Sequence, residues 1–160
     1  MAHLAGMRLS MAGQNPEGVI SYAAPRVGDQ VFAEAYERRV SAIRYEHTDD
    51  IVPHLPPGPL LLAALDQYPV IGPHFRGLQA WIYVSTGTLR FIDWTMQVVG
   101  DSQRLEAERI ASLALHIIRL KFQEVTDDHR PECGFGYMSA ICPGLCSAAD
   151  IAREACVPRA

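Results

Sequence analysis

The sequence has no hydrophobic run long enough to cross a membrane and no run of basic residues. Its longest purely apolar stretch covers residues 60–65, whereas a spanning helix needs about 20 apolar residues. The net charge of −4 excludes a nucleic-acid partner and does not favour anionic lipid surfaces. The N-terminus also lacks the long apolar core of a secretory signal peptide. The sequence therefore leaves open whether the protein is secreted or cytoplasmic.

Cysteine is absent from the first 132 residues, and the four cysteines all lie in the last 30, at Cys133, Cys142, Cys146 and Cys156. Three interpretations stay open. The cysteines form two disulfides that fix a C-terminal tail, or they are free buried thiols, or the spacing of Cys142 and Cys146 belongs to a zinc site. We expect no cofactor and no metal at the functional site.

The hydrophobic content of 49% and the charged content of 20% over 160 residues predict one domain with a packed core. The apolar run 19–24, ended by Pro25, is typical of a buried strand in a parallel sheet. Asp29 is a plausible N-cap for a helix that extends to Val40, and residues 41–47 form the next predicted strand. This strand–helix–strand order indicates α/β architecture.

Other elements follow from periodicity and turn residues. Apolar spacing predicts a helix over 2–12, helical turns over 60–66 and a long helix over 102–125. A last helix is expected over 147–156. The apolar segments 81–84 and 89–92 enclose Ser-Thr-Gly-Thr, which indicates a β-hairpin.

Two short motifs carry a family resemblance. They are Ala-Pro-Arg-Val-Gly-Asp at 24–29 and Asp-Ile-Val-Pro-His-Leu-Pro-Pro at 50–57. Together they resemble the class 3 (fungal-type) lipases, a family with an α/β-hydrolase fold and a Ser-Asp-His triad. Residues 2–9 resemble the helix that follows the nucleophile elbow in that family. The resemblance implies a partial α/β-hydrolase fold, the C-terminal half of a mostly parallel sheet, as a single N-terminally truncated domain over 1–160 with a Cys-, Gly- and Pro-rich tail from 129.

Asp50 is the first candidate catalytic residue. It follows an apolar strand, and active-site groups collect at the carboxyl ends of strands in open α/β sheets. By the resemblance it is the triad acid; the alternative is an aspartate that caps its own loop. His129 is the candidate base, because the family histidine often lies in a D-H-x-x-Y run. Only Asp128-His129 matches, and Glu132 stands where the tyrosine is expected.

The other histidines have lesser expected roles. His54 belongs to the second motif, and His74 lies in a stretch that loosely resembles a family segment, so both are candidates for lining the site. His116 is expected to be a packed or partly exposed residue of the long helix.

The nucleophile is missing from the pattern. A hydrolase elbow needs G-x-S-x-G, and the chain contains no such run. The first interpretation is a lipase-like serine ester hydrolase that acts on carboxylic esters or acylglycerols, with peripheral contact to lipid surfaces. The alternative is a non-catalytic, hydrolase-derived interaction domain that self-associates through an exposed strand edge or pairs with a separate N-terminal half. A third is a shortened chain without a function of its own.

Overall fold

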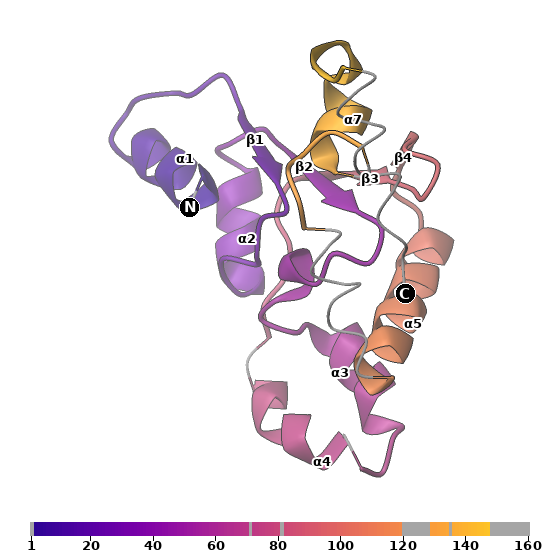
Figure 1. Cartoon of the computed structure of the whole chain (residues 1–160). Coiled ribbons are helices and arrows are strands. Elements are labelled where there is room, and N and C mark those ends of the chain that lie inside the picture. The colour runs from indigo at the N-terminus through magenta and orange to yellow at the C-terminus, as the bar shows by residue number, and fades with distance from the viewer. Residues whose placement is uncertain (1, 71, 81, 120–128, 135, 148–160) are drawn as a thin grey trace.

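A four-stranded mixed sheet forms the centre of the computed structural model (Figure 1), with the strand order β1-β2-β3-β4. The strands β1, β2 and β3 run parallel, and β4 pairs antiparallel with β3. Their bounds are Val19–Tyr22, Ala42–His47, Thr88–Ile92 and Val98–Gly100. The structure describes residues 2–70, 72–80, 82–119, 129–134 and 136–147. The sheet with its helices agrees with the expected α/β class.

One face of the sheet is covered by α1 (Ala2–Met11) and α2 (Gln30–Glu37). Asp29 caps α2 as expected, because its carboxylate accepts a hydrogen bond from the amide of Phe32 at 2.9 Å. Side chains alternate between the faces of a strand, so paired residues of neighbouring strands share a face. The buried core between these helices and the sheet consists of Val19, Tyr36, Val40 and Ala42.

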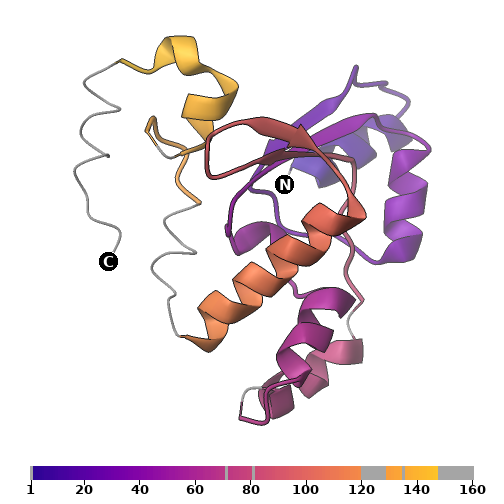
Figure 2. The same ribbon diagram turned by 90° about the vertical axis from the view of Figure 1, so that its right-hand side faces the viewer.

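A second core lies between α3 (Pro59–Asp66) and α5 (Gln103–Ile118). Figure 2 shows α5 in front of the sheet with α3 below it. The segment continues beyond α3 into α4 (Gly72–Phe75) and η2 (Arg76–Ala80), at the end of the molecule opposite α7 (Figure 1). None of the helices among the described residues is long and apolar enough to cross a bilayer. This core contains Leu61, Leu65, Ile110, Leu113, Ala114 and Ile117.

The predicted hairpin between 81–84 and 89–92 is wrong. Thr88–Ile92 pairs with β2 on one side and with β4 on the other, and Val84 makes only an isolated bridge to Gly28. The hairpin turn lies at 93–97 instead, where Asp93 accepts hydrogen bonds from the amides of Thr95 and Gln97. The Asp-centred turn was the signal that could have located it. The helix expected over 147–156 lies almost entirely outside the described residues.

The other face of the sheet carries α7 (Tyr137–Ile141) and η3 (Pro143–Leu145). A disulfide between Cys133 and Cys146 encloses both elements, and Cys142 is a free thiol. Cys146 is therefore not available for the zinc site considered above, and no group of metal-binding side chains occurs in the described part of the chain. Cys156 lies outside that part. The disulfide fixes α7 against the ends of the parallel strands.

Candidate functional site

Asp50 lies three residues beyond the end of β2, in a turn at the carboxyl edge of the parallel strands. Only 1% of Asp50 is exposed, so its carboxylate needs partners within the protein. The amide of Val52 donates to Oδ1 at 2.9 Å. Through this bond Asp50 caps its own loop, which was the alternative role given by the sequence. The other carboxylate oxygen, Oδ2, is left for further partners.

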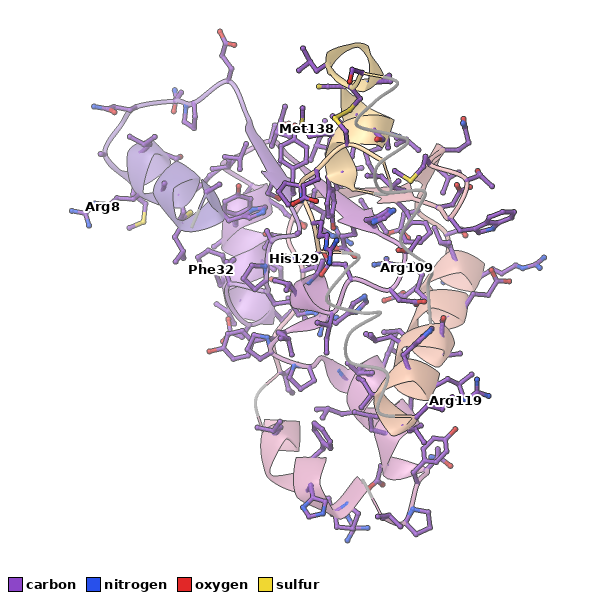
Figure 3. The ribbon with its side chains drawn as sticks, in the orientation of Figure 1. Arg8, Phe32, Arg109, Arg119, His129 and Met138 are labelled. Atoms are coloured by element: carbon purple, nitrogen blue, oxygen red, sulfur yellow. A yellow bond between two sulfur atoms is a disulfide. The ribbon has the colours of Figure 1, made fainter. Side chains whose placement is uncertain are left out.

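His129 lies against this carboxylate, 79 residues further along the chain. Its Nδ1 is 3.0 Å from Oδ2 and 3.1 Å from Oδ1 of Asp50, a geometry that assigns the proton to Nδ1. The imidazole is 44% exposed, whereas the carboxylate is fully buried. Nε2 has no hydrogen-bond partner among the described residues, and the imidazole is partly exposed, so this nitrogen is available to accept a proton. Figure 3 shows His129 in the middle of the molecule, below Met138.

Tyr137 is a site residue that the D-H-x-x-Y run did not predict. Its hydroxyl donates to Oδ2 of Asp50 at 2.7 Å and accepts from the amide of His47 at 3.0 Å. A tyrosine five residues beyond the expected position 132 therefore contacts Asp50, which only the three-dimensional structure reveals. Burial, together with the nearby Asp50 charge, raises the pKa of Tyr137, so it acts as a permanent donor.

Burial also dominates the electrostatics of Asp50. Desolvation raises the pKa of its carboxyl group, and the bonds from Tyr137, Val52 and His129 offset only part of that effect. No permanently charged cation contacts Asp50 among the described residues. Among the described residues, the imidazole of His129 is therefore the partner of Asp50 that can become a cation.

The tail that carries Tyr137 is held by covalent and steric constraints. The disulfide closes a segment with a sequence separation of 13, which limits the freedom of α7. At Gly136 an added Cβ would lie 2.3 Å from the carbonyl oxygen of Glu132 and 2.7 Å from that of Arg130. Only glycine permits this close approach, which places the first residue of α7 against Asp50.

A cavity of about 310 Å³ opens beside His129, between the end of β1 and α7. Ala23, on its wall, has φ +50, a left-handed conformation that suits glycine. Asp50 itself lies behind His129 rather than on the cavity surface. The lining residues are Tyr22, Ala23, His129, Pro131, Tyr137, Met138, Ile141 and Cys142.

His54 is placed elsewhere, in a buried charged cluster. Its Nε2 lies 3.3 Å from an amino group of Arg109, which also pairs with Glu46. Desolvation, reinforced by the charge of Arg109, lowers the pKa of His54 to about 3. His54 is neutral and does not line the cavity. Figure 3 labels Arg109 on α5, apart from His129.

The remaining histidines lie away from the cavity. His74 is exposed on α4, at the far end of the molecule in Figure 1. His116 contacts Asp49 and the carbonyl oxygen of Ser112 on α5. Neither histidine joins Asp50 in the structure.

Arg26 explains why the two signature motifs occur together. Its amide donates to the carbonyl oxygen of Leu55 at 2.8 Å, and its guanidinium donates to those of His54 and Pro56 at 3.3 and 3.1 Å. An added Cβ at Gly58 would lie 2.5 Å from this guanidinium. The first motif therefore fixes the proline-rich loop that follows Asp50.

A buried carboxylate behind a histidine, at the carboxyl end of a parallel strand, is an arrangement that the acid and base of Ser-His-Asp sites also adopt. The family model of class 3 lipases matches residues 1–59, which is 59 of the 160 residues and includes both motifs and Asp50. The resemblance to this lipase family is thus confirmed for that segment. His129 and α7 lie beyond it. No solved structure matches the chain.

Proposed function

We propose that this chain provides the acid and base of a lipase-like carboxylic ester hydrolase. The observation that carries the proposal is the hydrogen-bonded pair of Asp50 and His129, with His129 lining a cavity. In such a pair the histidine takes the proton from a nucleophile and returns it to the leaving alcohol. Asp50 fixes the Nδ1 tautomer and stabilises the imidazolium that forms.

The nucleophile in this proposal is a serine supplied by a segment that pairs with β1. Since the sequence contains no G-x-S-x-G, the described residues do not supply an elbow. β1 lies at the edge of the sheet that the described residues form, and its last residue, Tyr22, also lines the cavity. A strand added in parallel to β1 would end beside Tyr22, close to His129.

The test is hydrolysis of p-nitrophenyl butyrate by the purified chain, beside Asp50→Asn and His129→Ala. On this activated ester a histidine base can promote attack by water without a serine. A neighbouring-residue control is Asp49→Asn, because Asp49 contacts Ser112 and His116 rather than His129. Activity in the wild type and in the control that disappears in both site variants supports the proposal. Activity that survives in both site variants refutes the assigned roles, and a wild type without activity above background refutes the role of His129 as a base.

A second candidate function, strand-mediated association, is favoured by the same edge of the sheet. Ile20 and Tyr22 are 58% and 49% exposed on β1, and the sequence of β1, Val-Ile-Ser-Tyr, has none of the charges or prolines that usually protect an edge. A non-catalytic interaction domain would use this edge to pair with another chain. Light scattering tests it: a dimer that Ile20→Lys dissociates supports pairing, and a monomeric wild type refutes self-association.

A further inference from the structure

We propose that the cavity between β1 and α7 binds one linear acyl chain of roughly six to ten carbons, with its carbonyl end at His129. The inference rests on the proposed function and adds a substrate class to it, namely medium-chain carboxylic esters. It concerns a wall formed by the tail after residue 129, which lies outside the segment that matches the lipase family.

The cavity lining is mostly apolar. Ala23, Pro131, Met138 and Ile141 contribute apolar side chains, and the rings of Tyr22 and Tyr137 extend this surface. The hydroxyl of Tyr137 is already shared between Asp50 and the amide of His47. The thiol of Cys142 is only a weak hydrogen-bonding group.

His129 and the hydroxyl of Tyr22 are therefore the strong polar groups among the lining side chains. Because a buried polar group without a partner is costly, a ligand with several polar groups would be rejected. A ligand with one polar end and an apolar remainder fits the lining. An ester with an unbranched acyl chain has this composition, and it presents its reacting carbonyl to the base.

The volume sets the length of the chain. The cavity of about 310 Å³ is at the lower end of the range for ligand sites, about 300–1,000 Å³. A water-sized group takes roughly 30 Å³, so the cavity accommodates about ten groups of that size. An acyl chain of sixteen carbons would extend into solvent.

Met138 and Ile141 are the residues that would limit chain length. They are three positions apart on α7, so they lie on the same face of the helix, and both line the cavity. Leu145 belongs to the same disulfide-enclosed tail but is 73% exposed on η3 and does not line the cavity. It is therefore a matched control.

The first experiment measures binding without turnover, using straight-chain alkan-1-ols from butan-1-ol to decan-1-ol as neutral probes. Binding is followed by the ¹³C-methyl NMR signal of Met138, assigned with Met138→Leu. Each added methylene is expected to strengthen binding roughly fourfold until the cavity is full. Ile141→Trp should weaken octan-1-ol at least tenfold and leave butan-1-ol nearly unchanged, whereas Leu145→Trp should change neither. Affinities independent of length, or equal effects of the two tryptophans, would overturn the inference.

The second experiment separates this inference from the proposed function. Initial rates are measured on p-nitrophenyl esters from acetate to palmitate, and we expect a maximum between six and ten carbons that Met138→Ala moves to longer chains. Hydrolysis without a length preference would overturn the acyl site and leave the hydrolase intact. Length-dependent alcohol binding without hydrolysis would support the acyl site while the hydrolase proposal fails.

Discussion

Two buried carboxylates four positions apart, Glu46 and Asp50, are held in opposite ways. Glu46 is 4% exposed and pairs with Arg44, at 2.7 Å, and with Arg109. Although desolvation works against it, the two guanidinium charges lower the pKa of Glu46. Asp50 is as deeply buried, but its partners are a hydroxyl, an amide and a histidine, and the pKa of its carboxyl group is raised.

The difference separates a structural carboxylate from one suited to catalysis. Glu46 is neutralised by cations whose charge does not change near neutral pH, so its interaction energy stays constant during a proton transfer. Asp50 instead contacts an imidazole that gains charge when it accepts a proton. Its interaction energy is therefore largest in the charged state formed during acyl transfer, which is the behaviour a triad acid requires.

The largest effect is expected from Asp50→Asn. The amide cannot fix the Nδ1–H tautomer of His129, a fault that costs about 10⁴-fold in kcat in a complete Ser-His-Asp triad, so we expect the His129-dependent rate of this chain to be lost. The measurement is the rate of p-nitrophenyl ester hydrolysis, together with the ¹⁵N shifts of His129, which report the tautomer. A variant with the wild-type tautomer and rate would show that Asp50 only caps its loop.

Stability provides the complementary readout for Asp50→Asn. Since the folded-state pKa is raised above the ordinary value, 3.8, the native state binds this proton more tightly than the unfolded state. The free energy of unfolding therefore falls as pH rises from the ordinary pKa to the raised folded-state pKa. The loss of stability that results is still present at neutral pH. The asparagine variant should lack this dependence and unfold no more easily than the wild type at pH 7.

Arg109→Met is expected to have the opposite profile, with a loss of stability rather than a direct loss of chemistry. It leaves Glu46 with only Arg44 and removes a guanidinium that lies 4.6 Å above the Phe91 ring. Breaking a buried pair costs about 3–5 kcal/mol, measurable by urea unfolding. The control is Arg104→Ala, which breaks an exposed pair with Glu108 and should cost less than about 0.5 kcal/mol.

The parts of this structure that could be predicted from sequence are those that depend on neighbouring residues. Periodicity and the Asp29 cap predicted α2, and the apolar runs predicted β1 and β2. The pairing of β3 could not be predicted, because a short apolar strand does not specify which strand it joins. Tyr137 was missed for a related reason: its position opposite Asp50 depends on the disulfide between Cys133 and Cys146 and on Gly136, whose joint effect is not a local pattern.

Tyr137→Phe tests whether Asp50 depends on its fixed donor. The variant loses a hydrogen bond to a charged group, worth about 1.5–3 kcal/mol, and leaves the buried amide of His47 without this acceptor. Because that donor lowers the pKa of Asp50, its loss raises the pKa further. The acid limb of the pH–rate profile should then move to higher pH. The control is Tyr45→Phe, since Tyr45 packs in the same core but does not bond to Asp50. If the acid limb does not move in Tyr137→Phe, Tyr137 contributes only packing.

The last prediction concerns His54 and the slope of stability with pH. Burial holds the pKa of His54 at about 3 in the folded state, against 6.5 ordinarily. Between these values the unfolded chain binds a proton that the native state does not. The contribution of His54 to the free energy of unfolding therefore has its full value above pH 6.5. It decreases toward pH 3, by at most about 1.4 kcal/mol per pH unit.

This slope has the opposite sign to that of Asp50, so the two sites can be told apart in one titration. Urea unfolding between pH 4 and pH 7 should show a smaller fall in stability for His54→Asn than for the wild type. His74→Asn, which removes an exposed histidine, should keep the wild-type slope. If His54→Asn has the wild-type slope instead, His54 takes up its proton equally well in the folded and the unfolded state. Glu46 would then lie beside a histidine that changes charge, as Asp50 does, and the distinction between the two carboxylates would fail.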